Sequence, residues 1–274
     1  MADGGGQRQV EWMREEGVNC PRNLKLVRLG VAGARALGAL LGDECVGLVV
    51  TDLDLYACGI EEEGALAIAE GLAVSRRLVA LSLSGPNALT GRAIEALLAV
   101  NVLQQLVLQD AGLTDDSALV IASALTRRDC SLRHLNLMAN PFTAGGIFAV
   151  AAALRVNNSL HAFYYTGVAD VEVLQTIERY NFRIRELQCG PAEQSAKVVE
   201  RNTALWRARQ KSALMMIAIR WRRRTPLLSQ VPKDVVKLIV AEMMRVPYTS
   251  SSSSTSSSVA ASLSFAAERS CCIS

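Results

Sequence analysis

The chain has 274 residues, of which 50% are hydrophobic and only 5% aromatic, so Leu, Ala and Val must fill the core of one large domain or two modest ones. Its formal charge of +3 is too small by itself to indicate a nucleic-acid-binding protein. The charge is uneven, because residues 1–190 carry 16 basic and 21 acidic side chains, whereas residues 191–249 carry 12 basic and 4 acidic ones. This split predicts two regions with different partners.

Cysteine usage and hydropathy indicate the compartment. The seven cysteines are an odd number without a CxxC pair, which argues against a disulfide framework and against a zinc site. The first 25 residues contain no long apolar run, and residues 213–219, the most apolar stretch of the C-terminal half, are far fewer than the roughly 20 that span a bilayer. We therefore expect a cytoplasmic protein without a signal peptide.

Strand motifs recur along residues 24–190, after an N-terminal flank at 1–23 that could form a short helix. Each motif follows an L-x-x-L-x-L pattern, as in Leu132, Leu135 and Leu137, and the first copy, with Leu24, Val27 and Leu29, is the weakest. The copies are 24 to 29 residues apart, a period typical of leucine-rich repeats. Six to seven repeats are predicted, with the central positions Val27, Leu53, Leu81, Leu106, Leu135, Phe163 and Leu187.

Helical patterns separate these strands, at residues 62–76, 90–101, 115–127, 144–157 and 171–180. Apolar residues recur three and four apart, as in Leu119, Ile121, Ala122 and Leu125. Thr114 and Thr143 supply N-cap side chains before two of the helices. Ala and Gly dominate the apolar faces because each helix must lie close to a strand.

The motif LxxLxLxxN, followed by a GxxxLAxAL-like helix, is best preserved at residues 132–154 and 50–72 and resembles the ribonuclease-inhibitor class of leucine-rich repeats, which NLR receptors also contain. The resemblance covers residues 24–190. It implies an α/β solenoid, a horseshoe with a parallel sheet on the concave face and helices on the convex face. Asn140 is the turn asparagine of the motif, Cys58 and Ala111 replace it in other copies, and residues 84–89 predict an irregular turn.

Residues that flank the core leucines of each strand should point into the concave groove. They mix acids, amides, aromatics and Met, a composition suited to protein recognition. We therefore predict that a protein partner binds this surface, through the candidate residues Asp52, Asp54, Tyr56, Gln105, Gln109, His134, Asn136, Met138 and Tyr164.

Catalytic motifs are missing from the pattern. Only two histidines exist, His134 and His161, and nothing local places a nucleophile beside either one. The glycines near residues 30–42 lack the spacing of a phosphate-binding loop, and His and Cys never cluster at ligand spacing. We expect a non-enzymatic chain with no cofactor and no metal.

A basic helical region follows at residues 191–246. Its segment KVVERNTALW resembles the final helix of ribonuclease-inhibitor-like arrays, which implies a C-terminal helical cap over the exposed end of the core. The basic patch Arg220, Arg222, Arg223 and Arg224 is denser than a cap needs. A solvated helix end, a nuclear-import or RNA patch, a calmodulin-type target and contact with anionic lipid are alternative explanations.

Residues 226–246 resemble the opening LPxDLxxxIxxxL helix of F-box motifs, with Pro232, Val235, Val236 and Ile239 at matching places. A weaker similarity to a SOCS box lacks the cysteine of the elongin-binding helix. Either resemblance implies a ubiquitin-ligase adaptor whose repeats hold the substrate. The later F-box helices are missing, and an ordinary packing hairpin is the alternative.

We expect the tail, residues 247–274, to be a Ser-rich disordered segment, and it ends in CCIS. Cys271 heads a C-a-a-X prenylation pattern with Ser at X, and Cys272 could carry a second lipid. Three hypotheses follow: a scaffold that binds protein on its concave face, a ubiquitin-ligase adaptor, and a scaffold tethered to membrane by lipid. A nucleic-acid binder ranks last.

Overall fold

The computed structural model describes residues 4–43, 45 and 49–224. The chain divides into two compact units between Thr203 and Ala204. The first unit contains the repeats, and the described part of the second is the C-terminal part of one helix, from residue 204 to residue 224. The candidate residues Pro232, Val235, Val236, Ile239, Cys271 and Cys272 lie outside the described residues.

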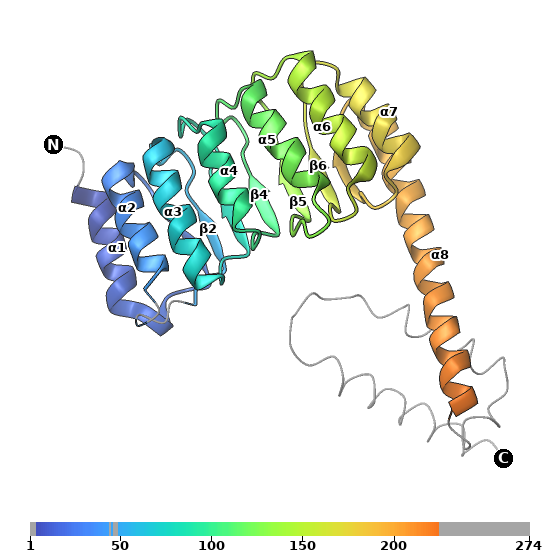
Figure 1. Ribbon diagram of the computed structural model, residues 1–274, viewed down its shortest axis with the longest axis horizontal. Helices are drawn as coiled ribbons and strands as arrows, with labels where there is room; N and C mark the ends of the chain where they lie inside the picture. Colours follow the sequence, from blue (N-terminus) through green and yellow to red (C-terminus); the bar gives the residue numbers. More distant parts are fainter. Residues whose placement is uncertain (1–3, 44, 46–48, 225–274) are drawn as a thin grey trace. The chain divides into compact units, whose positions relative to one another are not determined.

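Seven short strands form one parallel sheet in chain order, which is the topology of a solenoid. The strands are β1 (Asn23–Lys25), β2 (Asp52–Asp54), β3 (Ala80–Ser82), β4 (Gln105–Val107), β5 (His134–Asn136), β6 (Ala162–Tyr164) and β7 (Glu186–Gln188). A helix follows each strand, and in Figure 1 the helices of the first unit stand side by side as an outer row while the strands form the inner one. The predicted α/β leucine-rich-repeat solenoid is confirmed.

The helices differ in length and in how they begin. They are α1 (Gly4–Glu16), α2 (Gly30–Leu41), α3 (Glu61–Ser75), α4 (Gly91–Ala99), α5 (Asp115–Thr126), α6 (Ala144–Val156), α7 (Asp170–Tyr180) and α8 (Ala192–Arg224), with a short 3-10 helix η1 at Gly17–Asn19. Thr143 caps α6 by accepting the N–H of Gly145, as predicted. The Thr114 side chain makes no such bond to α5, so this predicted cap is wrong. Asp115, the first residue of α5, accepts hydrogen bonds from the N–H and the hydroxyl of Thr143 in the next repeat.

Each strand contributes one central apolar residue to the core. Leu53, Leu81, Leu106 and Leu135 are direct partners in adjacent strands, and none is more than 2% exposed. The two end positions, Leu24 and Leu187, are only partly buried because each has one neighbouring strand. Each coil therefore completes its interior with side chains from the next.

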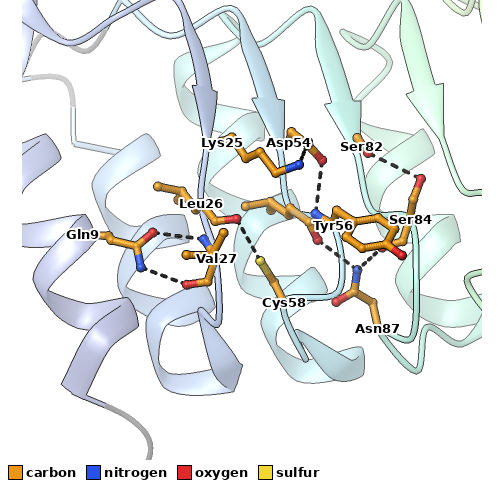
Figure 2. Close-up of polar contacts among 11 residues, drawn as sticks. Gln9, Lys25, Leu26, Val27, Asp54, Tyr56, Cys58, Ser82, Ser84 and Asn87 are labelled. Carbon is orange, nitrogen blue, oxygen red and sulfur yellow. Dashed lines mark hydrogen bonds and ion pairs between the residues drawn. The ribbon is translucent and has the colours of Figure 1, made fainter.

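The first repeat has a different register from the predicted one. Leu24, and not Val27, is paired with Leu53, and Val27 is 51% exposed. The Val27 backbone is held from outside the sheet, because the Gln9 side chain of α1 accepts its N–H at 3.0 Å and donates to its carbonyl at 2.8 Å (Figure 2). Helix α1 thus satisfies backbone groups beside the first strand.

The predicted turn asparagine, Asn140, is 7% exposed and joins two coils. Its Nδ2 donates to the carbonyls of Leu108 at 2.7 Å and Leu137 at 3.0 Å, and its Oδ1 accepts the N–H groups of Ala111 and Leu113 at 3.1 Å. The side chain therefore satisfies buried backbone groups of the preceding repeat as well as its own.

Asn87 does the same work in the irregular turn. Its Nδ2 donates to the carbonyls of Leu55 and Leu83, and its Oδ1 accepts the N–H of Ile60. It lies four residues after its strand leucine, whereas Asn140 lies three after Leu137. The irregularity of residues 84–89 is thus one additional residue before the asparagine.

Cys58 replaces the asparagine one repeat earlier. Its thiol donates to the Leu26 carbonyl at 3.3 Å, so it keeps one bond of the set, as Figure 2 shows. Burial is the main reason why the pKa of this thiol is raised. A neutral thiol is the form that can donate this bond.

A second set of buried asparagines joins the coils where the helices end. Nδ2 of Asn157 donates to the Leu125 carbonyl at 2.9 Å, and Nδ2 of Asn181 donates to the Leu154 carbonyl at the same distance. Asn202 of α8 extends the set by donating to the carbonyl of Ile184. Together with buried Ser195 and Val198, this places the start of α8 as a cap on the last coil.

Small residues allow close packing of α2 against α3. A Cβ atom on Gly38 would be in hard contact with the Ala67 carbonyl, and one on Gly71 would be in hard contact with the Gly38 carbonyl. The predicted core stripe of α5 needs one correction, because Leu119 is 55% exposed, whereas Ile121, Ala122 and Leu125 are buried as predicted.

Candidate partner-binding surface

The nine candidate residues of the concave face lie on or directly after strands β2, β4, β5 and β6. Because side chains alternate along a strand and the central apolar residues face the helices, the flanking residues face the opposite side of the sheet. Tyr56 and Gln109 are exposed, and the others are partly buried. The sheet thus brings all nine to one surface, in rows that cross the strands at right angles.

The N-terminal part of this surface is charged. Lys25 Nζ lies 3.1 Å from Asp54 Oδ2 and 5.7 Å from the centre of the Tyr56 ring, and all three come from β1, β2 and the turn after β2 (Figure 2). A hollow of about 290 Å³ lies here, and its lining includes Asp52, Ser82 and Gln105. The hollow forms because the side chains of Ala80 and Ser82 on β3 are shorter than those of the neighbouring strands β2 and β4.

An aromatic and acidic cluster occupies the C-terminal part. The rings of His134 and Tyr164 are 5.0 Å apart, and the Tyr164 hydroxyl donates to Glu186 Oε2 at 3.1 Å. Burial lowers the pKa of His134, and the Glu186 carboxylate opposes this effect. Burial and the same carboxylate raise the pKa of Tyr164. Both rings are therefore uncharged near neutral pH and offer hydrogen bonds and apolar faces.

Some positions of the sheet surface offer less than the sequence pattern indicates. Ala80, Ser84 and Ala162 face the concave side by register, yet each is buried. The Ser82 hydroxyl donates to that of Ser84 at 3.4 Å, so part of their polarity is used internally. These positions of β3 and β6 therefore add little side-chain surface that a partner can reach.

A group of basic residues beside this surface was missed by the sequence reasoning. Arg133, His161 and Arg185 each stand directly before a strand, in three consecutive repeats, and Arg183 lies two residues before Arg185. The signal was present, because the position after the first leucine of the motif is basic in Leu132-Arg133, Leu160-His161 and Ile184-Arg185. The leucine-rich-repeat motif is defined by its apolar positions, so it does not reveal a basic residue between them.

The predicted basic patch, Arg220, Arg222, Arg223 and Arg224, is within α8 as far as its backbone is concerned. Those arginine side chains lie outside the described residues, as do the adaptor segment and the lipidation cysteines. In the described part of the chain, no group of three metal-ligating side chains comes together, and no helix is both long and apolar enough to cross a membrane.

No protein-family model matches this chain, and no curated protein does. Among solved structures it is similar to Leiomodin-1 Actin-Binding Site 2, with 20% sequence identity and a TM-score of 0.46. The match covers 55% of this chain and 94% of that one. At this level the similarity bears on neither a partner nor an activity, and the finer assignment to the ribonuclease-inhibitor class stays a prediction.

Proposed function

We propose that this chain is a non-enzymatic scaffold whose concave sheet surface binds a protein partner. One observation carries the proposal: polar and aromatic side chains of mixed chemistry are displayed along a rigid parallel sheet, with the core leucines fixed behind them. A preorganised surface loses little conformational freedom on binding. Tyr56 at one end and Tyr164 at the other are the aromatic anchors that such interfaces favour.

The contacts within the surface support binding more than catalysis. His134 contacts an aromatic ring, and the Glu186 carboxylate accepts a hydrogen bond from Tyr164. A general base needs a nucleophile within hydrogen-bond distance. Among the described contacts of His134 and Glu186, the Tyr164 phenol is the one hydroxyl or thiol in such a position. That phenol has a raised pKa, which makes it a poor nucleophile at neutral pH.

The test compares two pairs of substitutions on opposite faces. Tyr56→Ala with Tyr164→Ala removes both aromatic anchors from the sheet surface. Leu119→Ala with Phe148→Ala removes two exposed apolar side chains from helices α5 and α6 and serves as the matched control. Proteins that co-purify with the full chain are identified first, and the affinity of the purified partner is then measured for each variant.

We expect the sheet pair to weaken the partner's affinity at least about tenfold, because buried aromatic anchors dominate interfaces. The helix pair should change it by less than about twofold. If the helix pair abolishes binding while the sheet pair leaves it intact, the convex face is the interface and the proposal is wrong.

The two roles predicted from the C-terminal sequence stay predictions. Deletion of residues 226–246 should remove a ubiquitin-ligase subunit from the co-purified proteins if the F-box-like segment docks one. Cys271→Ser should move the protein out of the membrane fraction and remove a lipid from its intact mass if the CCIS terminus is prenylated. Unchanged co-purification or unchanged partitioning would exclude the respective role.

A further inference from the structure

The basic residues at the edge of the sheet are neighbours in space because the strands are parallel and in register. The N–H of His161 donates to the Arg133 carbonyl at 2.7 Å, and the N–H of Arg185 donates to the His161 carbonyl at 2.7 Å. The backbone thus holds three consecutive repeats side by side at this position. We call Arg133, Arg183 and Arg185 the edge arginine cluster.

The charges that act on His161 are mostly positive. After burial, Arg185, Arg133 and Arg183 are the causes that lower the pKa of His161, and the Glu186 carboxylate alone opposes them. The edge therefore carries three positive charges against one negative charge. Like charges at short range repel unless an anion lies between them.

Two members of the cluster have free guanidinium groups within the described part of the chain. Among the described residues, no ion pair or side-chain hydrogen bond reaches the guanidinium group of Arg133 or Arg183, and both residues are exposed. Asn181 Oδ1 accepts the backbone N–H of Arg183 and leaves its guanidinium group untouched. Guanidinium forks form bidentate, charge-assisted hydrogen bonds with carboxylates. Arg133 and Arg183 are thus available to an anionic group that lies at the cluster.

We propose that the edge arginine cluster binds an acidic segment of the protein partner that lies on the concave surface. This inference rests on the proposed function. Glu186 links the two sites, since it follows Arg185 directly and accepts the hydroxyl hydrogen of Tyr164. A partner carboxylate at the cluster therefore places the adjoining partner residues over the Tyr164 and His134 rings.

Charge elsewhere on the surface favours a peptide with a short acidic stretch over a nucleic acid. Asp52, Asp54 and Glu186 lie on the concave side, so an extended polyanion along the sheet would meet carboxylates. Residues 1–190 also carry more acidic than basic side chains, 21 against 16. A nucleic acid needs a continuous positive surface, whereas a local acidic stretch needs only the cluster.

The experiment uses the full chain and two labelled peptides of equal length, one rich in Glu and one with every Glu replaced by Gln. Arg133→Gln with Arg183→Gln removes two charges from the cluster. Arg14→Gln with Arg22→Gln is the matched control, because it removes the same charge from exposed positions and Arg22 precedes β1 as Arg133 precedes β5. Affinity is measured by fluorescence anisotropy at low and high salt.

We expect the Glu peptide to bind the parent chain and the control equally, with an affinity that falls as salt increases. The Arg133→Gln, Arg183→Gln variant should bind it at least about fivefold more weakly, since exposed carboxylate pairs each contribute a modest factor. Equal binding of the Gln peptide, an equal loss in the control, or tighter binding of single-stranded RNA than of the Glu peptide would overturn the proposal.

A second readout keeps folding and binding apart. The chain has two histidines, so its imidazole NMR spectrum has two sets of signals. Addition of the Glu peptide should raise the pKa of His161 more than that of His134, because the bound carboxylates offset the arginines. If partner binding depends on Tyr56 and Tyr164 while the Glu peptide fails to bind, this inference is wrong and the proposed function stands. If the Tyr56→Ala, Tyr164→Ala variant binds the partner with unchanged affinity, the proposed function is wrong.

Discussion

Single asparagine side chains determine how one coil is joined to the next. Asn140 and Asn87 connect coils after the strands, and Asn157 and Asn181 connect them after the helices. Each satisfies buried backbone groups of the preceding repeat. Loss of such a side chain leaves those groups without a partner, which costs about 1–3 kcal/mol for each buried group.

The neighbours Asn157 and Asn158 provide a matched test of this effect. Asn157 is 5% exposed and bonds to Leu125, Ser159 and Leu160, whereas Asn158 is exposed and bonds only to the Val156 carbonyl. Asn157→Ala should lower the free energy of unfolding by about 3 kcal/mol, and Asn158→Ala by less than about 0.5 kcal/mol. Urea denaturation measures both, and equal losses would contradict the structural role of Asn157.

The two histidines make stability depend on pH. Burial lowers the pKa of both His134 and His161 below the ordinary value of 6.5, and around His161 Arg185, Arg133 and Arg183 act in the same direction while Glu186 opposes them. Between 6.5 and the lower folded pKa, the unfolded chain binds more protons, so stability falls as pH falls through this window.

We therefore expect the urea midpoint to decrease between pH 7.5 and pH 6.0, with a slope of no more than two protons. The pKa values of Asp115 and Asp129 are lowered from 3.8 by hydrogen bonds from Thr143 and Arg127, so these groups do not titrate in this range. The double variant His134→Gln, His161→Gln should flatten the dependence. An unchanged slope in that variant would show that other groups are responsible.

At the scale of elements, the close packing of α2 and α3 depends on glycines at their crossing. Gly71→Ala would force a Cβ atom against the Gly38 carbonyl, a backbone atom that cannot rotate away. We expect a loss of about 1–3 kcal/mol in the free energy of unfolding. Gly5→Ala is the control, since no atom lies within 4 Å of its added Cβ and alanine favours a helix. If Gly71→Ala stabilises the protein as Gly5→Ala does, the Gly71 Cβ position is not blocked by the Gly38 carbonyl and the expectation is wrong.

The elements could be predicted from the sequence where a repeat has neighbours on both sides. Leu53, Leu81, Leu106 and Leu135 follow the period because each must fill the same place in the core. At the first strand, two registers fit the apolar pattern: one places Leu24 at the central position and the other places Val27 there. The sequence of this coil alone does not distinguish them, and the structure has Leu24 paired with Leu53. Only the pairing with β2 and the bonds from Gln9 fix the register.

The candidate surface could be predicted in part for a related reason. Alternation places Tyr56 and Tyr164 on the outer side of the sheet from the sequence alone. It does not reveal that Ser84 is buried, which depends on the packing around the irregular turn. The edge arginine cluster depends on which repeats are adjacent, and this is a property of the assembled sheet.

At the scale of the whole first unit, the start of α8 protects the last coil from water. Val198 is 3% exposed and belongs to the continuous core, while Ala196 in the same helix turn is exposed. Val198→Asp should cost about 3 kcal/mol or more because it buries an unpaired carboxylate. Ala196→Asp should cost less than about 1 kcal/mol, which is the helix-propensity term.

Hydrogen exchange locates the loss. In a solenoid each coil contacts only its neighbours, so Val198→Asp should accelerate exchange most in α7 and β7 and least in β1 and β2. Uniform acceleration would mean that the seven coils unfold as one unit and not from the uncapped end.

The in-register row of leucines also determines how the array would respond to force. Each coil shares its core only with the coils directly beside it. A force applied to the chain ends should therefore unfold the coils one after another and not all at once. One repeat of 29 residues, as between Leu106 and Leu135, would release roughly 90 Å of extended chain at each step. The extension of a stretched molecule would thus increase in successive steps, and the length of each step would be determined by the number of residues in one repeat.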